Sequence, residues 1–214
     1  KAKTASMNPE PDRLSSPRLV AFSIAGLSIG GVPTALLLFL PAFYSQHFGL
    51  PLELVGFAVM LSRFWNAFSD PIVGLLSDRT QTRFGRRKPW VVAGGVLMIV
   101  ACAAVFSPAG KPGLVYFGVW LFVLYLSLSM VSTPLYAWAG SLSDRYHERT
   151  RIQTHLQVMT ALGPALILLL PLFLDRVGYG DQATKVASMG WFIVATLAVG
   201  IPILVFRFAE RPAS

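Results

Sequence analysis

Charged side chains are scarce in this sequence. Asp, Glu, Lys and Arg make up only 13% of its 214 residues, whereas hydrophobic residues make up 54%. An ordinary soluble domain has about 25% charged residues. The composition therefore argues against a soluble monomer and favours a protein that lies in a membrane.

Cysteine is nearly absent, because the chain has only Cys102, inside an apolar run. One cysteine cannot form a disulfide framework, a cysteine-based zinc site or an iron–sulfur site. The histidines at positions 47, 147 and 155 do not have metal-ligand spacing, and we find no Ser-His-Asp, zinc-helix or phosphate-loop pattern. We therefore predict that the protein is not an enzyme and has no cofactor.

Long apolar stretches are abundant, and about 20 apolar residues suffice for one helix to cross a bilayer. None of them alternates with a period of two, so we expect helices and not barrel strands. The sequence predicts an all-α integral membrane protein, a bundle of six transmembrane helices within residues 18–214 that follows a flexible tail at 1–17. The expected spans are 19–44, 52–76, 90–106, 114–138, 156–174 and 189–208.

Basic residues predict how the bundle is oriented. The net charge is +8, and most Lys and Arg precede the first span, follow the last, or lie between spans two and three and between four and five. The other side has only Lys111, Arg176 and Lys185. The positive-inside rule then places both termini in the cytoplasm, as in a multi-pass protein of the cytoplasmic (inner) membrane. We expect no nucleic-acid partner, because no basic patch is interleaved with aromatic residues.

A motif between spans two and three narrows the family. Its second part reads Gly74-Leu-Leu-Ser-Asp78-Arg79 and then Gly85-Arg86-Arg87-Lys88, and it resembles the signature loop of the major facilitator superfamily. With Asp70-Pro71-Ile72-Val73-Gly74 before it and Lys88-Pro89-Trp90 after it, the stretch resembles the glycoside-pentoside-hexuronide:cation symporters, the melibiose permease family. The resemblance implies one six-helix half of a secondary transporter that carries a sugar, glycoside or related polar solute by alternating access.

The same motif supplies candidates for a cytoplasmic latch. A glycine lets a neighbouring helix approach closely, and Arg provides fork-shaped donors for a carboxylate or a lipid phosphate. A related phrase, Gly140-Ser-Leu-Ser-Asp144-Arg145, follows span four. The alternative is a solvated basic loop with no latch. The candidate latch residues are Gly74, Asp78, Arg79, Gly85, Arg86, Arg87, Asp144, Arg145 and Arg149.

Arg63 and Asp70 fall well within span two, where a charge costs on the order of 3 kcal/mol. On an ideal helix they share a face with Asn66, which suggests a bundle interior or a wet cavity. We interpret Asp70 as the carboxylate of a coupling-ion site, as the resemblance also implies. An ion pair that merely stabilises the bundle is the alternative.

The sequence departs from the family where cation and sugar sites are expected. Asn66, Ser132 and Gly30 stand at positions where melibiose permeases carry Asp. A sodium site made of Asp70, Asn66 and Ser132 would be poor, because sodium prefers charged oxygen ligands. Proton coupling through Asp70, uncoupled transport, or loss of transport fits better.

The candidates for lining a solute cavity are polar or aromatic side chains on span two and span five. Trp65 could stack on a sugar ring, and Gln153, Gln157 and Thr160 follow one helical face. Arg63 completes this set. For the hydroxyl side chains, ordinary helix packing in lipid is the alternative.

The functional hypotheses differ in what the bundle assembles with. As one half of a transporter, it needs a second six-helix half, which could be a C-terminal continuation, an identical mate or another membrane subunit. A rival is a non-transporting six-helix subunit that docks onto a larger complex, which the replaced carboxylates favour. A further alternative is transport of an amphiphilic, lipid-like solute.

Overall fold

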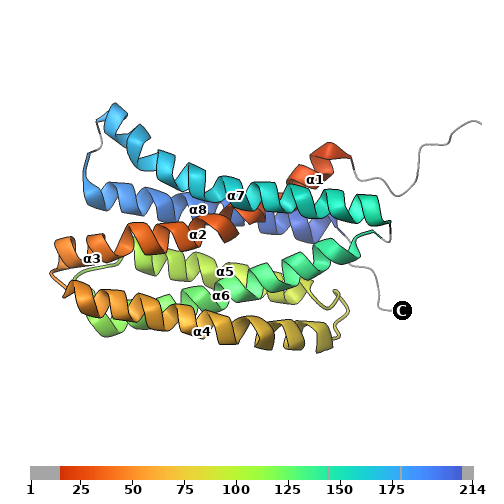
Figure 1. Ribbon diagram of the computed structural model, residues 1–214, viewed down its shortest axis with the longest axis horizontal. Coiled ribbons are helices and arrows are strands. Elements are labelled where there is room, and N and C mark those ends of the chain that lie inside the picture. The colour runs from red at the N-terminus through yellow and green to blue at the C-terminus, as the bar shows by residue number, and fades with distance from the viewer. Residues whose placement is uncertain (1–14, 144, 179, 209–214) are drawn as a thin grey trace, which may run out of the picture.

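The computed structural model describes residues 15–143, 145–178 and 180–208, which form helices and no strand (Figure 1). This confirms the expected all-α fold. The helices are α1 (Ser16–Ser23), α2 (Ala25–Leu38), α3 (Leu40–Phe48), α4 (Leu52–Arg79), α5 (Lys88–Phe106), α6 (Leu114–Ser141), α7 (Tyr146–Val177) and α8 (Gln182–Arg207).

The first apolar stretch, expected as one span over 19–44, is divided into three consecutive helices. The residues between them, Ile24 and Phe39, keep right-handed helical backbone angles. α1 and α2 meet at Ile24, and α2 and α3 meet at Phe39. Pro41 has no N–H with which to bond the carbonyl of Leu37, so the helix that ends at Leu38 cannot continue in regular form. α3 starts again with this proline in its first turn, where no N–H is needed.

Within the part of the chain that the structure describes, five helical segments are long and apolar enough to cross a membrane: 16–38, α5, α6, α7 and α8. α4 is not among them, although its 28 residues would reach about 42 Å. Its middle carries Arg63, Asn66 and Asp70, which lower its mean hydropathy. α4 runs alongside the other helices and packs against α6 (Figure 1).

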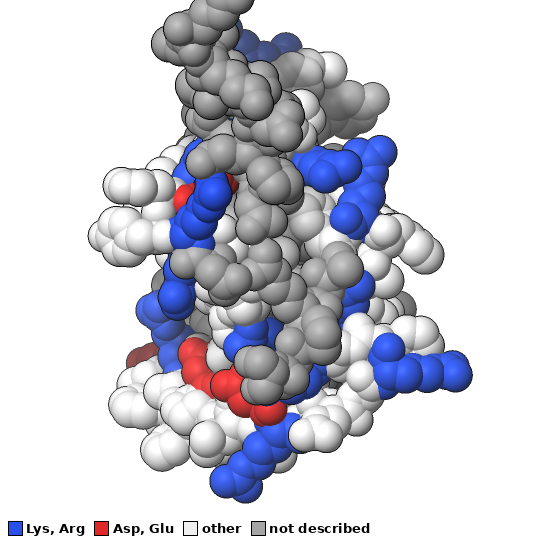
Figure 2. Space-filling model, turned by 90° about the vertical axis from the view of Figure 1, so that its right-hand side faces the viewer, with Lys and Arg blue, Asp and Glu red and all other residues white. Residues whose placement is uncertain are grey.

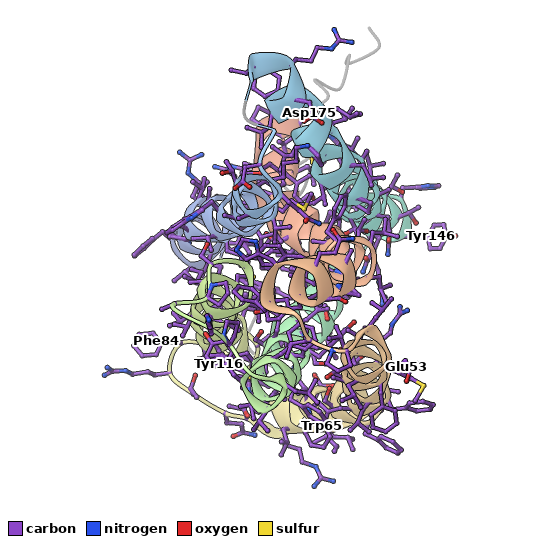
Figure 3. All side chains as sticks on the ribbon, turned by 90° about the vertical axis from the view of Figure 1, so that its left-hand side faces the viewer. Glu53, Trp65, Phe84, Tyr116, Tyr146 and Asp175 are labelled. Carbon is purple, nitrogen blue, oxygen red and sulfur yellow. The ribbon has the colours of Figure 1, made fainter. Side chains whose placement is uncertain are left out.

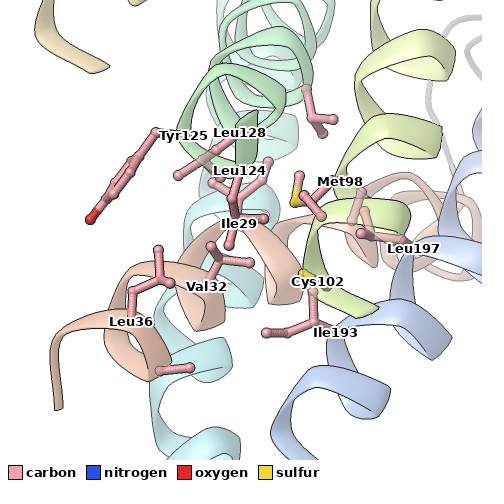
Figure 4. Packing of buried hydrophobic residues seen from close by; sticks show 14 of the residues in the cluster. Ile29, Val32, Leu36, Met98, Cys102, Leu124, Tyr125, Leu128, Ile193 and Leu197 are labelled. Atoms are coloured by element: carbon pink, nitrogen blue, oxygen red, sulfur yellow. The ribbon is translucent and has the colours of Figure 1, made fainter. Parts of the chain in front are cut away.

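The core lies where α2, α5, α6 and α8 meet. Ile29 and Val32 of α2 face Met98 and Cys102 of α5 within one buried cluster, which Leu124 of α6 joins (Figure 4). α4 and α7 lie at opposite edges of the bundle, with α2 and α6 between them (Figures 1 and 3). Both edge helices expose many large apolar side chains.

Glycines allow α2 and α7 to pack with their backbones in contact. A Cβ at Gly30 would overlap the carbonyl oxygen of Thr160, and one at Gly163 would overlap the carbonyl oxygen of Leu27. Small residues are the usual means by which membrane helices approach this closely. Gly30 therefore has a packing role at the position where the resemblance implies a sugar-contacting Asp.

One end of the bundle, which we call the basic end, is where α4 and α6 end and α5 and α7 begin (Figure 1). Lys and Arg outnumber Asp and Glu on this face (Figure 2). α1 begins here too, and Arg151 at the start of α7 donates to the Ser16 hydroxyl at 3.3 Å. At the opposite end Lys185 forms a 2.5 Å ion pair with Asp175 and thereby joins α8 to α7.

Candidate functional site

A polar network joins the middle of α4 to α6. Asn66 Nδ2 donates to Asp70 Oδ2 at 3.1 Å, and Ser129 Oγ donates to Asn66 Oδ1 at 3.2 Å. The hydroxyls of Ser69 and Ser129 lie 2.8 Å apart. Ser69 Oγ also lies 3.1 Å from the backbone carbonyl of Asn66, to which it can donate. Each hydroxyl has one proton and a second acceptor within reach, so either serine can be the donor in the contact between them. The network gives hydrogen-bond partners to polar side chains in the middle of α4.

One oxygen of Asp70 remains outside this network. Its Oδ1 is buried and accepts no hydrogen bond from the described residues. An ionised carboxylate only accepts hydrogen bonds, so this oxygen could receive a proton or a cation. Pro71 follows directly and cannot donate to the carbonyl of Ala67, which leaves a further acceptor near the site.

Ser132, the predicted third member of the coupling site, makes no hydrogen bond with the described residues. The hydroxyl that reaches Asn66 belongs to Ser129, three residues earlier on α6. Which of the α6 serines faces α4 depends on how α6 is rotated in the bundle, and sequence spacing does not fix this. Within the described ranges, no three or more His, Cys, Asp or Glu side chains cluster to hold a metal ion.

The two remaining candidates on α4 lie away from the Asp70 network. Arg63 is exposed. It lies about 10 Å from Asp70 along the helix axis, so the two charges do not pair with each other. Trp65 is 39% exposed and packs against Phe122, with ring centroids 5.9 Å apart.

The candidates on α7 follow a second polar surface. Gln153 Nε2 donates to the carbonyl of Tyr136 at 3.1 Å, and the hydroxyls of Tyr136 and Thr160 lie 3.4 Å apart. Gln157 is exposed. An open groove of about 610 Å³ runs along this part of α7, and it is lined by Tyr146, Arg149, Thr150, Gln153, Thr154, Gln157, Val158 and Ala161.

The groove and the Asp70 network lie on helices at opposite edges of the bundle (Figure 3). The described residues therefore do not bring the predicted ion site and the predicted solute-lining residues of α7 into contact. Thr160 is drawn into the packed seam with α2, whereas Gln153, Gln157 and Arg149 line the groove.

At the basic end, Arg87 connects three helices. Its Nη1 donates to the carbonyl of Ala137 and to the hydroxyl of Ser141, each at 2.8 Å, and its Nη2 lies 3.2 Å from Asp78 Oδ1. Arg87 precedes α5, Asp78 lies in the last turn of α4, and the other acceptors end α6. Of the predicted latch residues, Asp78 and Arg87 are thus paired across the ends of α4 and α5.

Other predicted latch residues have lesser or different contacts. Arg79 is exposed and Arg86 half-buried, and neither makes a hydrogen bond or ion pair with the described residues. Gly85 adopts φ +111°, a conformation that favours glycine, and so shapes the loop. A Cβ at Gly74 would meet Thr133 Cγ2 at 3.4 Å, an ordinary packing distance.

Arg149, which lies four residues after the second charged phrase (residues 140–145), makes a contact with the start of that phrase. Its guanidinium lies beside Gly140, where a Cβ would meet Nη2 at 3.4 Å. Asp144 lies outside the described residues. The backbone N–H of Arg145 donates to the Ser143 hydroxyl at 3.3 Å as the chain turns into α7. Sequence reasoning missed the Ala137 carbonyl, because a backbone acceptor leaves no mark in a sequence. It missed the Ser141 hydroxyl because that contact depends on how the end of α6 packs beside Arg87.

Comparison with known proteins gives consistent results. Residues 21–214 match the family described as MFS/sugar transport protein. The chain is 31% identical over 143 residues to the inner membrane symporter YicJ of Escherichia coli strain K12, covering 64% of this chain and 31% of that protein. It is 30% identical to the isoprimeverose transporter of Lactiplantibacillus pentosus, covering 78% of this chain and 35% of the relative.

A further relative is the putative glycoside/cation symporter YagG of Escherichia coli strain K12. The identity is 30% over 199 residues, which cover 90% of this chain and 42% of that protein. The chain thus spans about a third to two fifths of the length of these relatives.

Proposed function

Since this chain belongs to the MFS/sugar transport protein family, we propose that it supplies six helices of a secondary transporter that moves a sugar or glycoside together with a cation. The printed names of its relatives, a glycoside/cation symporter and an isoprimeverose transporter, support this solute class. The family is one of transport proteins, which supports a non-enzymatic role. The chain is a multi-pass membrane protein, and its similarity to an inner membrane symporter supports the cytoplasmic membrane.

The observation that carries the coupling proposal is the buried, unbonded Oδ1 of Asp70. A charge within a membrane-spanning helix is costly, and such residues usually mark ion pathways. Taking up a proton or a cation at this oxygen would remove the uncompensated charge. The energy gained would favour one arrangement of α4 against α6, and this is how ion binding can drive a change of access.

A proton suits the site better than sodium. The amide oxygen of Asn66 already accepts from Ser129, and the Ser69 and Ser129 hydroxyls bond one another. Hard cations prefer a cage of several oxygen ligands, but here only one carboxylate oxygen is free of hydrogen bonds from the described residues. A proton needs one oxygen only.

The latch would hold the basic end closed in one access state. Arg87 joins the ends of α4 and α6, so separating these helices requires its bonds to break. Hydrogen bonds to a charged group contribute roughly 1.5–3 kcal/mol each. The free energy of solute and ion binding can offset the loss of these bonds. The partners of Arg87 would then be rehydrated at the open end.

Exposed polar groups on the edge helices support a second helical unit beside this one. Arg63 on α4 and Gln157 on α7 are exposed, and acyl chains would leave both unsatisfied. We infer that these edges face a wet cavity between this bundle and a second six-helix half, in keeping with two-half transporters.

Uptake by proteoliposomes tests the proposal. The protein is expressed from its complete open reading frame and offered a panel of radiolabelled oligosaccharides that includes isoprimeverose. An inward proton gradient should drive saturable accumulation of at least one sugar, and an inward sodium gradient should not. Sodium-driven accumulation would overturn the choice of ion. Absence of saturable uptake under both gradients would overturn transport and favour a non-transporting subunit.

A further inference from the structure

The loop between α4 and α5 is fixed at both of its ends. Trp90 Nε1 donates to Thr80 Oγ1 at 2.9 Å, and Arg87 binds α4 and α6. Between these points, Thr82 Oγ1 donates to the Gly85 carbonyl at 2.5 Å and accepts from the Phe84 N–H at 3.3 Å. The turn at residues 82–85 is therefore held in one conformation, in which its side chains have defined directions.

Phe84 projects away from the bundle. Its side chain is 63% exposed. When the bundle is viewed down its long axis, this side chain extends sideways beyond the ribbon, on the side of Tyr116 (Figure 3). The Arg83 guanidinium lies over this ring, 4.6 Å from its centroid. An exposed aromatic ring of this size is not explained by packing within the chain.

The sideways direction decides what surrounds this pair. The long axis of a membrane-spanning bundle lies roughly along the bilayer normal, so a side chain that extends sideways at the basic end meets lipid at headgroup depth. Aromatic rings are enriched at this depth, and Arg there reaches lipid phosphates. A residue that pointed along the axis would meet water instead.

The charges around the pair favour an anion. Arg83 makes no hydrogen bond or ion pair with the described part of the chain, and its five N–H donors suit a phosphate. Arg79 and Arg86 flank it in sequence and make no ion pair with described residues either. The acidic side chain that ends α4, Asp78, is bound to Arg87.

We propose that Arg83 and Phe84 form a binding site for the phosphate of an anionic phospholipid. The Phe84 ring lies among the upper acyl carbons, and the Arg83 guanidinium, held over the ring, binds the headgroup phosphate. Because the loop continues into Arg87, lipid bound here is attached to the element that carries the latch. The site would serve the protein whatever solute it carries.

Native mass spectrometry of the detergent-solubilised full chain, titrated with dioleoylphosphatidylglycerol, tests this site. Arg83→Gln should weaken binding of the first lipid about fivefold, because it removes the guanidinium that binds the headgroup phosphate. Phe84→Ala should weaken it as well, and Phe84→Tyr should restore it. Arg79→Gln is the matched control, because it removes the same charge from an exposed arginine with no ring contact, and it should change binding less than twofold.

Several results would overturn the site. Equal weakening by Arg79→Gln and Arg83→Gln would show that only net charge matters, and unchanged binding by Phe84→Ala would exclude the ring. Dioleoylphosphatidylcholine should bind the wild type more weakly than the anionic lipid, and equal binding would contradict a preference for anions. Displacement of the lipid by excess inorganic phosphate would show a site for free phosphate, because phosphate has no acyl chain to contact Phe84.

Discussion

Arg87 and Asp78 form a 3.2 Å ion pair in which the two side chains differ greatly in exposure, 13% for the arginine and 57% for the aspartate. The exposed partner is easily replaced by water, whereas the guanidinium is also bound to α6 through Ala137 and Ser141. The arginine is therefore the residue that connects the three helices, and in the proposed latch the exposed carboxylate is its most easily released partner.

Replacing Arg87 by Lys should weaken the latch although the charge is kept. An ammonium group is a compact point charge and cannot place donors on three acceptors as the planar guanidinium does. We expect a loss of about 2 kcal/mol and an apparent melting temperature several degrees lower, measured by fluorescence-detected size-exclusion chromatography. Arg86→Lys is the control and should melt like the wild type; equal destabilisation by both variants would contradict the latch.

Gly30→Ala should destabilise the protein because the new Cβ would overlap the Thr160 carbonyl in the seam between α2 and α7. Overpacking of this kind costs about 1–3 kcal/mol. Gly56 offers a matched control, since a Cβ there meets nothing within 4 Å. Thermal melts should show a lower midpoint for Gly30→Ala only. If both alanine variants melt alike, the close approach of the two helices is wrong.

Ser129→Ala and Ser132→Ala should differ, because only the Ser129 hydroxyl bonds to Asn66 and Ser69. Losing it leaves buried polar atoms unsatisfied, which costs about 1–3 kcal/mol. Uptake assays and thermal melts should therefore show a clear defect for Ser129→Ala and little change for Ser132→Ala. The reverse ranking would mean that α6 presents a different face to α4.

The helical membrane fold could be predicted because it depends on local properties, namely the length and apolarity of each stretch. The span expected at 19–44 is divided into consecutive helices at Ile24 and Phe39, both of which keep helical backbone angles. Prolines occur inside intact helices too, as Pro71 and Pro134 show. A proline alone therefore does not reveal whether a helix will break.

The candidate site was predictable only in part. Asp70 and Asn66 are four residues apart on one helix, so their contact follows from helix geometry. Ser129 and Gly30 depend on how two distant segments pack, which no local pattern encodes. The contacts of Arg87 with Asp78 and Ala137 likewise depend on the positions of three helix ends. The motif between spans two and three predicted that Asp and Arg side chains would lie there, but not which arginine would bind Asp78.

The central claim is that Asp70 couples ion movement to solute movement, and Asp70→Asn tests it most directly. The complete protein in proteoliposomes is assayed for accumulation driven by a proton gradient and for exchange of internal against external sugar, with Asp181→Asn, at the opposite end of the bundle, as the control. We predict that Asp70→Asn abolishes accumulation and retains exchange, while the control retains both. Undiminished proton-driven accumulation by Asp70→Asn would contradict the account.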